Sequence, residues 1–411
     1  MSGHGPSGDG AGLGGHGRPG GGAGLGGRAA IAGIGATEFS KRSGRSELRL
    51  AAEAVLSALD DAGLSPRDVD GMVTYTQDAN QEIAVARETG IGELTFFSRV
   101  EYGGGAACGT VVHAAMAVAT GMAHTVVCYR AFNERSGRRF GRPDSRLTGE
   151  PTSQGLEMSW HVPFGLMTPA AWVAMFARRY MHVYNATSED FGRVAVAMRR
   201  HAATNPAAWF HGRPITLEDH QASRWIAEPL HLLDCCQESD GAVALVVTSA
   251  ERARDLRTSP AVITAAAQGS GAGQMMMTSY YRDDMTTLPE MSTVARHLWA
   301  TSGLSPEDIQ TAILYDHFTP FVLTQLEELG FCGRGEAPDF LKDGSIELDG
   351  ALPINPHGGQ LGEAYIHGMN GIAEAVRQIR GTAANQLRDV RNVLVTAGTG
   401  VPTSGLILSA E

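Results

Sequence analysis

A segment of fourteen residues occurs twice in this 411-residue chain, and this internal repeat limits the folds that the chain can adopt. Ala62-Gly-Leu-Ser-Pro-Arg-Asp-Val-Asp-Gly-Met-Val-Thr-Tyr75 resembles Ser302-Gly-Leu-Ser-Pro-Glu-Asp-Ile-Gln-Thr-Ala-Ile-Leu-Tyr315. Each copy predicts a helix end, a glycine break, a capped turn and a buried strand ending in tyrosine. Coincidence is the alternative, because Gly-Leu-Ser-Pro-x-Asp can end one helix and start another in any protein. Apolar runs that begin at Ala29 and Ala261 precede the two copies at a similar distance, which favours a duplicated half.

Short apolar runs alternate with helical stretches along the whole chain. Several runs are apolar on both faces, as in strands buried between layers of helices. The helix expected over 46–62 begins with Ser46, a residue that caps helices. This alternation predicts an α/β protein with a largely parallel sheet. The expected strands are 29–35, 71–75, 125–129, 241–248, 261–267, 311–315, 392–397 and 405–409.

The repeat and the local composition divide the chain into four parts. Residues 1–28 are mostly glycine and should form a disordered tail, in which a metal-binding role for His4 and His16 is the weaker alternative. An N-terminal half covers 29–131 and 169–255, and a C-terminal half covers 256–411. The periodicity fails over 132–168, which predicts an irregular loop insertion in the first half.

Charge and cysteine content exclude several classes of protein. The formal net charge of −11 argues against general nucleic-acid binding, which needs basic surface to neutralise phosphates. Five irregularly spaced cysteines do not suggest a disulfide framework and fit reduced thiols in the cytoplasm. The first stretch lacks the apolar core of a signal peptide, and no later segment is expected to be apolar for long enough to cross a membrane. We therefore expect a soluble cytoplasmic protein.

Four motifs resemble the thiolase family, and specifically its sterol-carrier or lipid-transfer type. The resemblance covers nearly all of 29–411 and implies a thiolase fold: two duplicated five-layered αβαβα halves with a loop-domain insertion. The motifs are Tyr315-Asp-His-Phe-Thr, Asn355-Pro-His-Gly-Gly-Gln-Leu-Gly, Thr396-Ala-Gly-Thr-Gly, and Leu233-Asp-Cys-Cys with Ser239-Asp-Gly-Ala.

The chain departs from that family at the residues that carry thiolase chemistry. The position of the nucleophilic cysteine corresponds to Gly104, that of the activating histidine to Tyr365, and that of the final cysteine to Thr396. Cys108 lies one helical turn beyond Gly104, where a side chain tends to pack into the core. Acyl transfer through a covalent enzyme intermediate is therefore not expected.

The resemblance brings two tyrosines to one pocket. Tyr315 replaces the residue that opens the family motif, and Tyr365 replaces the catalytic histidine. This combination resembles the thiolase-like aldolases of actinobacterial steroid side-chain degradation. It implies retro-aldol cleavage of 17-hydroxy-3-oxo-4-pregnene-20-carboxyl-CoA to androstenedione and propionyl-CoA. Coenzyme A is then part of the substrate, and no further cofactor or metal is implied. The resemblance also implies a homodimer core joined to a small OB-fold acyl-CoA-associated protein in a heterotetramer.

A retro-aldol reaction needs a base for the β-hydroxyl, stabilisation of the enolate, and an acid for the α-carbon. Tyr315 and Tyr365 are the candidate base and acid in either order, assisted by His317 and His367. A tyrosine that ends an apolar strand is more often a core residue, so this alternative stays open for Tyr315. The candidate enolate-stabilising groups are Gly103, Gly104, Gly105, His357, Gly358 and Gly359.

Two further groups are weaker candidates for substrate binding. Arg135, Arg138 and Arg139 lie in a basic run that could meet CoA phosphates, although a solvated loop is the favoured interpretation. Met275 and Met276 could line a pocket for a rigid sterol, although a flexible apolar lining is favoured.

Two other functions remain as alternatives. One is a thiolase or acyltransferase that uses Cys108 as its nucleophile. The other is a non-catalytic scaffold that binds acyl-CoA. Silent relatives usually lose polar site residues, whereas this chain has tyrosines and histidines there, which favours activity.

Overall fold

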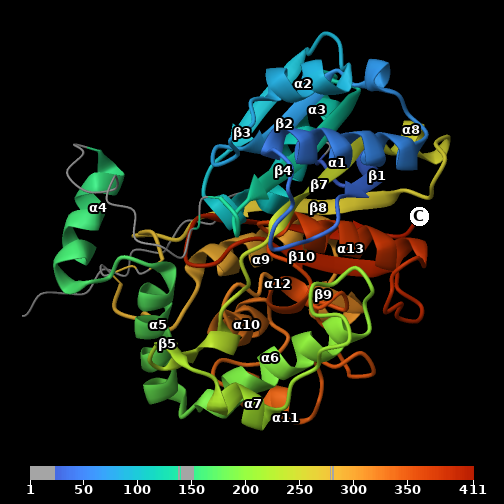
Figure 1. Ribbon diagram of the computed structural model, residues 1–411. Helices are drawn as coiled ribbons and strands as arrows, with labels where there is room; N and C mark the ends of the chain where they lie inside the picture. Colours follow the sequence, from blue (N-terminus) through green and yellow to red (C-terminus); the bar gives the residue numbers. More distant parts are fainter. Residues whose placement is uncertain (1–23, 138, 140–151, 278, 280–281) are drawn as a thin grey trace, which may run out of the picture.

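The computed structural model describes residues 24–137, 139, 152–277, 279 and 282–411. Nine strands of this part form one continuous sheet in the order β3-β2-β4-β7-β1-β8-β11-β10-β9 (Figure 1). Two short strands, β5 (Trp225–Ala227) and β6 (Leu230–His231), pair separately. The strands of the large sheet are β1 (Ala29–Ala36), β2 (Gly71–Tyr75), β3 (Phe96–Val100), β4 (Thr125–Asn133), β7 (Asp240–Ser249), β8 (Ala261–Gly269), β9 (Thr311–Ile313), β10 (Asn392–Thr396) and β11 (Thr403–Ser409).

The two halves of the sheet have the same topology, which confirms the duplication. The order β1-β7-β4-β2 in the first half recurs as β8-β11-β10-β9 in the second. In both halves the first two pairings are antiparallel and the third is parallel. Strands β1 and β8 join the halves through the pairs Ala30–Val262 and Ile31–Ala261. The predicted bounds of the halves stay predictions.

The expectation of a largely parallel sheet is wrong. Among the pairings of the large sheet, only β2–β3, β2–β4 and β9–β10 are parallel. Strands β7 and β11 return antiparallel to both of their neighbours. Helices cover both faces of each half, so the strands are apolar on both faces whatever their direction, and the sequence pattern does not distinguish the two cases. The same pattern missed β3, an edge strand with an exposed Phe97.

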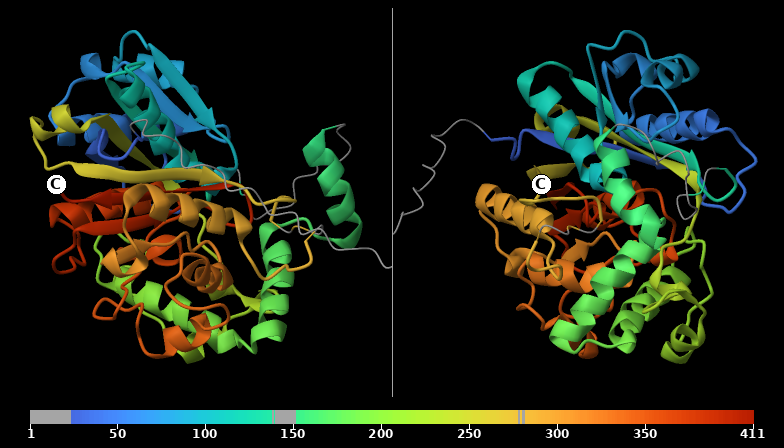
Figure 2. Two further views of the ribbon diagram at one scale, coloured as in Figure 1. Left: turned by 180° about the vertical axis from the view of Figure 1, so that it is seen from behind. Right: turned by 90° about the vertical axis from the view of Figure 1, so that its left-hand side faces the viewer.

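Helices lie on both faces of each half of the sheet (Figures 1 and 2). Ser46 caps α1 as predicted, since its side chain accepts a hydrogen bond from Arg49 N. Two helices, α3 and α13, contact strands of both halves and share one apolar core with them. The helices are α1 (Glu47–Ala62), α2 (Glu82–Thr89), α3 (Ala106–Thr120), α4 (Ser153–His161), α5 (Pro169–Tyr184), α6 (Ser188–Ala203), α7 (Leu217–Ala222), α8 (Ala250–Arg254), α9 (Pro289–Ser302), α10 (Thr319–Glu328), α11 (Ala337–Lys342), α12 (Gly359–Gly362) and α13 (Met369–Arg380).

The central helix corrects the expectation that no segment is apolar enough to cross a membrane. The window Gly103–Thr120, which includes α3, is long and apolar enough by composition. However, 67% of it is buried inside the protein. A helix that packs between two halves of a sheet needs apolar residues nearly all round, so it has the composition of a membrane span without being one.

The described ends of the predicted tail and of the predicted insertion contain regular structure or hydrogen bonds to the fold. Gly27 N donates to Ile263 O, and the Arg28 guanidinium donates to Ala119 O, so the end of the 1–28 segment packs on the fold. The first twenty-three residues, with His4 and His16, lie outside the described residues. Within the 132–168 segment, β4 continues to Asn133 and α4 forms a helix that projects from the body of the protein (Figure 2).

Close packing of α1 on β1 depends on glycines in the strand. A Cβ added at Gly35 would lie 2.3 Å from both Ala54 O and Ala58 N. We expect Gly35→Ala to lower the free energy of unfolding by about 1–3 kcal/mol or more, because backbone atoms of α1 cannot move aside cheaply. Urea unfolding followed by circular dichroism measures this. Gly92→Ala is the matched control, since an added Cβ there has no atom within 4 Å. Equal stability of the two variants would contradict this packing.

Candidate active site

Two buried phenols meet at the point where the two halves of the protein join. Tyr315 follows β9, and Tyr365 lies between α12 and α13. The Tyr315 hydroxyl donates a hydrogen bond to the Tyr365 hydroxyl at 3.3 Å. The side chains are 3% and 9% exposed. Burial raises the pKa of both phenols well above the usual value of 10, so both are neutral at physiological pH. The predicted convergence of Tyr315 and Tyr365 is therefore confirmed.

The Tyr315 phenol fills the space that a side chain at residue 104 would need. Gly103–Gly105 form a single turn that leads into α3. A Cβ added at Gly104 would lie 1.8 Å from Tyr315 Oη and 2.2 Å from Cζ. A cysteine at this position cannot coexist with the phenol. The position of the Tyr315 phenol therefore requires a glycine at residue 104.

Cys108 does not replace the missing nucleophile. Its side chain is fully buried and its Sγ lies 3.7 Å from Val395 O. Burial raises the pKa of the thiol far above its usual value. The interpretation of Cys108 as a core residue is confirmed by this packing.

Thr396 supports Tyr315 from the position that corresponds to the final family cysteine. Its hydroxyl accepts a hydrogen bond from Tyr315 N at 2.9 Å and donates to Gln325 Oε1 at 2.7 Å. Gln325 Nε2 in turn donates to Tyr315 O at 2.9 Å. Both backbone polar groups of Tyr315 are therefore fixed, which holds its phenol in place.

His367 is held as a neutral imidazole beside Tyr365. Arg130 Nε donates to His367 Nδ1 at 3.1 Å, so the ring proton of the neutral form is on Nε2. The ring stacks on Phe132 and meets the edge of Tyr365 at a centroid distance of 5.0 Å. Burial, and then the charge of Arg130, lower its pKa well below 6.5. His367 can therefore donate a hydrogen bond near the phenols but is a poor base.

His317 is a second neutral imidazole, on the Tyr315 side. Its ring lies 4.9 Å from that of Tyr315 and stacks on Phe321. Burial lowers its pKa to about 3. Within the described part of the chain, its buried Nδ1 has no hydrogen-bond partner. A substrate group that bonds to Nδ1 would remove the cost of this unpaired atom.

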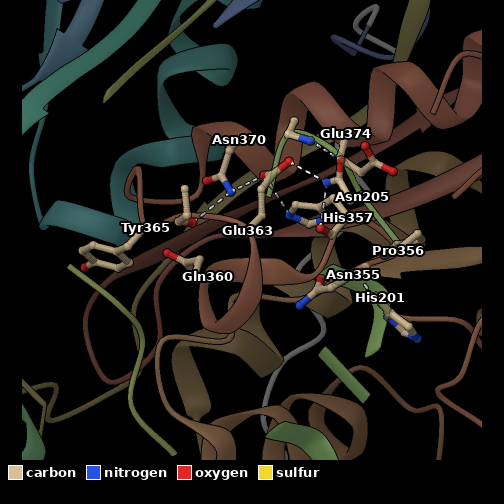
Figure 3. Close-up of polar contacts among 12 residues, drawn as sticks. His201, Asn205, Asn355, Pro356, His357, Gln360, Glu363, Tyr365, Asn370 and Glu374 are labelled. Atoms are coloured by element: carbon tan, nitrogen blue, oxygen red, sulfur yellow. Dashed lines mark hydrogen bonds and ion pairs between the residues drawn. The ribbon is translucent and has the colours of Figure 1, made fainter. Parts of the chain in front are cut away.

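His357 lies apart from the phenols, so its predicted place in the enolate site is not supported. Figure 3 shows it among Asn205 and Glu363, with Gln360 between this group and Tyr365. His357 Nε2 is 3.9 Å from Glu363 Oε2, and Asn205 Nδ2 donates to His357 O. The motif around His357 had suggested a place beside the phenols, but its Nε2 lies near Glu363 instead.

Several of the predicted backbone donors are already used within the fold. Gly105 N donates to Tyr102 O, and Gly358 N donates to Asn355 O. Gly359 lies against Asp316, whose Oδ2 would be 2.0 Å from an added Cβ. Asp316 accepts from Gln360 N at 2.8 Å and so caps α12. The enolate-stabilising roles of Gly103 and Gly104 remain predictions, whereas Gly105 and Gly358 need their peptide hydrogens for the fold.

The described arginines of the basic run are paired. Arg139 Nε donates to Glu238 Oε1 at 2.8 Å, and Arg135 lies 3.9 Å from the same carboxylate. Arg138 lies outside the described residues. These two arginines are therefore less available to CoA phosphates than the sequence suggested.

A small cavity of about 20 Å³ lies beside the loop that follows β10. It is lined by Met277 of the methionine run rather than by Met275 or Met276, together with Phe176, Leu288, Arg282 and Gly400. In the described part of the chain, no group of three histidine, cysteine or acidic residues could hold a metal ion.

Glu134 is a buried carboxyl that sequence reasoning missed. It follows β4 directly and is 3% exposed. Burial, and then the charge of Glu238, raise its pKa to about 8. Sequence reasoning missed it because it lies near the start of 132–168, the segment that was interpreted as an irregular insertion. The available signal was the alternation Arg130-x-Phe132-x-Glu134, which extends the strand beyond its predicted end at residue 129.

Family models match both halves of the chain. The model "Thiolase, N-terminal domain" matches residues 29–251, and "Thiolase C-terminal domain-like" matches residues 271–409. The chain therefore belongs to the thiolase family.

Two relatives are similar over nearly the whole chain. A steroid side-chain-cleaving aldolase from Thermomonospora curvata is 72% identical, over 93% of this chain and 98% of the relative. The 17-hydroxy-3-oxo-4-pregnene-20-carboxyl-CoA lyase from Mycobacterium tuberculosis is 71% identical, over 93% of this chain and 99% of the relative. At this level of identity the chain is an aldolase of the thiolase fold.

Solved structures agree with this assignment. A chain of the Ltp2-ChsH2(DUF35) aldolase is 71% identical and superposes with a TM-score of 0.90, over 94% of this chain and 98% of the other. A monomeric SCP2-thiolase-like protein type 1 from Mycobacterium smegmatis shares the fold, with a TM-score of 0.71 at 20% identity, over 93% of this chain and 78% of the other.

The overlap at Gly104 can be tested directly. We expect Gly104→Ala to displace the Tyr315 hydroxyl and lower the rate of carbon–carbon cleavage by at least about a hundredfold. Cys108→Ala is the control: turnover should stay near wild type, with a loss of at most a few kcal/mol of stability from the cavity. Ketone release from a β-hydroxyacyl-CoA measures both rates. A folded Cys108→Ala protein with activity lowered more than a hundredfold would contradict this assignment.

Proposed function

We propose that this protein cleaves 17-hydroxy-3-oxo-4-pregnene-20-carboxyl-CoA to androstenedione and propionyl-CoA by a retro-aldol reaction. The observation that carries the proposal is the Tyr315 phenol in the space of the thiolase nucleophile. It replaces a group for covalent catalysis with a group for proton transfer. The names of the two relatives with more than 70% identity support the steroid thioester as the substrate class.

The chemistry needs no covalent intermediate. A base removes the proton of the tertiary β-hydroxyl while the bond between the α- and β-carbons breaks and a ketone forms. The bonding electrons pass into the thioester as an enolate, whose α-carbon then receives a proton. Tyr315 and Tyr365 carry these two proton transfers, and neutral His317 and His367 orient them. The peptide N–H groups of Gly103 and Gly104, in the turn that leads into α3, stabilise the enolate oxygen. Coenzyme A belongs to the substrate, so the reaction requires no further cofactor or metal.

The two alternative functions fit the site less well. A thiolase that uses Cys108 would need a thiolate, and burial without a nearby cation opposes its formation. A non-catalytic scaffold gains nothing from buried polar atoms that have no hydrogen-bond partner. Among the described residues, His317 Nδ1 is such an atom. Such atoms cost stability, so their presence favours a site that binds and transforms a polar substrate.

We further propose that the protein works in the cytoplasm as a homodimer core with a small OB-fold partner in a heterotetramer. The similar Ltp2-ChsH2(DUF35) aldolase is named as a two-component assembly, which supports a partner. The α4 region adds a physical reason, because it exposes large apolar side chains that a partner could cover. These are Leu156, Trp160 and Phe164, at 66%, 61% and 77% exposure.

We therefore expect the isolated chain to be poorly soluble or weakly active until it is co-expressed with such a partner. Size-exclusion chromatography with light scattering gives the assembly, and cleavage assays with and without the partner give the rate. Full activity of a lone homodimer would contradict the proposed dependence on a partner.

Removing either phenolic hydroxyl should abolish cleavage while leaving the fold intact. For both Tyr315→Phe and Tyr365→Phe we expect kcat to fall by about 10²–10⁴-fold, as for the loss of a general acid or base. A purely structural hydroxyl would instead cost about 1–2 kcal/mol of stability and little rate. Because the two transfers belong to one reaction, the double variant should be little slower than the slower single variant. A near-wild-type rate in Tyr365→Phe would remove this residue from the mechanism.

A further inference from the structure

One face of β4 lies against the segment that contains Tyr365 and His367. Side chains alternate between the faces of a strand, so Arg130, Phe132 and Glu134 lie on one face. Arg130 bonds to His367, and Phe132 stacks on His367 and meets the edge of Tyr365 at 6.3 Å. Glu134 is the next residue on this face, and its charge helps to raise the pKa of both phenols.

The strand opposite confirms the side on which Glu134 lies. Glu134 N donates to Ser239 O at 3.3 Å, which pairs the two residues across the strands. Residues that pair in this way point to the same face. The Ser239 hydroxyl accepts a hydrogen bond from Tyr365 N at 3.2 Å, so this face is the one that contains Tyr365.

Glu134 has the features of a group that exchanges protons rather than of a structural anion. It is 3% exposed, and its Oε2 has no hydrogen-bond partner within the described residues. The buried carboxylate of Asp78, in contrast, pairs with Arg130 at 2.9 Å. A buried carboxyl oxygen without a partner is costly unless it binds water or substrate in the working enzyme.

We propose that Glu134 is the proton reservoir of the reaction, which receives the substrate's hydroxyl proton through one phenol and returns it to the α-carbon through the other. This inference rests on the proposed retro-aldol function. Glu134 acts through Tyr315 and Tyr365 and is thus a positioning and proton-storing residue rather than one that touches the reacting carbons.

The proton balance closes with no added reactant. In the first step the β-hydroxyl gives its proton to a phenol, which passes its own proton through a bridging water to the Glu134 carboxylate. The α–β bond breaks, its electron pair forms the enolate, and the ketone forms. In the second step the Glu134 carboxylic acid returns the proton through the second phenol. The enolate electron pair then forms the new C–H bond of propionyl-CoA, and Glu134 is a carboxylate again.

Burial raises the pKa of Glu134 into a range where its carboxyl can accept and return a proton. Neutral phenols with strongly raised pKa values are poor final proton acceptors, whereas the pKa of Glu134 is raised only to about 8. The ionisable or charged groups that influence Glu134 and the phenols are Lys41, Arg130, Glu238, Asp316, Cys236, Tyr315 and Tyr365. Burial raises the pKa of Asp316 to about 6. Lys41 is the nearby cation that donates to Gln237 and to the Glu238 backbone, and burial lowers its own pKa to about 8.

The sign of the pH dependence follows from the form that accepts the proton. Only the carboxylate can act in the first step, so kcat of the wild type should fall as the pH decreases below about 8. Glu134→Gln should lower kcat by about 10²–10⁴-fold with little change in KM, and the remaining activity should lose this acidic limb. Glu134→Asp should keep the limb at a lower rate. Because Lys41 is retained in all three proteins, these profiles separate its titration from that of Glu134.

A second readout reports the proton transfer without carbon–carbon cleavage. With androstenedione bound, the wild type should exchange the α-hydrogens of propionyl-CoA for deuterium in D₂O, since this is the last step run backwards. Mass spectrometry measures the exchange, and Glu134→Gln should slow it by about the same factor as cleavage. The control is Glu327→Gln, because Glu327 is also a buried carboxyl with a raised pKa and a tyrosine partner, Tyr180, but lies at the end of α10. Its rates should stay near wild type.

The outcomes separate this inference from the proposed function. A folded Glu134→Gln protein within about threefold of wild type in cleavage and exchange would overturn the role of Glu134 alone. A wild-type holoenzyme that neither cleaves the thioester nor exchanges the α-hydrogens would overturn the proposed function itself. If Glu134→Gln does not fold, loss of the acidic limb in Glu134→Asp overturns the inference and its retention supports it.

Discussion

Residue 104 and the Tyr315 phenol compete for one volume, and the chemistry of the site depends on which of them fills it. With glycine at residue 104, the phenol lies where a Cβ would begin, 1.8 Å away. A thiol at this position would have to expel the phenol. Because the two residues come from different halves of the duplicated sheet, the packing of one half on the other brings them together. Acyl transfer and proton transfer are therefore mutually exclusive in this arrangement.

Desolvation sets the protonation state of nearly every group around the phenols. Burial keeps Tyr315 and Tyr365 as neutral phenols and His317 and His367 as neutral imidazoles. A buried site of neutral groups binds an uncharged hydroxyl and thioester without a large electrostatic cost. It also strengthens each hydrogen bond made to the enolate as charge develops. Burial raises the pKa of the Glu134 carboxyl to about 8, and this carboxyl influences the pKa of both phenols.

The sequence predicts those features that leave a local pattern. The repeat predicted the duplicated topology, and the family motifs identified Gly104, Tyr315 and Tyr365 by position. Strand direction could not be predicted, because a strand covered by helices on both faces is apolar whether it runs parallel or antiparallel. Glu134 was missed because its role depends on register across β4 and β7, which a single segment does not reveal. The role of His357 stays a prediction: it lies within a motif that contributes to the site, but its Nε2 is 3.9 Å from Glu363 Oε2.

The duplicated fold explains how an aldolase site can arise while the thiolase architecture stays intact. Helices α3 and α13 contact strands of both halves, so the turn at the start of α3 and the segment that precedes α13 meet at the centre of the protein. A helix N-terminus directed at a thioester stabilises an enolate whether the bond beyond it is made or broken. Replacing thiol and histidine by phenols changes the proton donors and acceptors around that enolate while the strands and central helices remain as they are. The cost lies in Gly104, which forbids a side chain, and in Glu134, whose buried Oε2 has no hydrogen-bond partner among the described residues. Stability is given up at these two residues because the reaction requires that space and that proton acceptor.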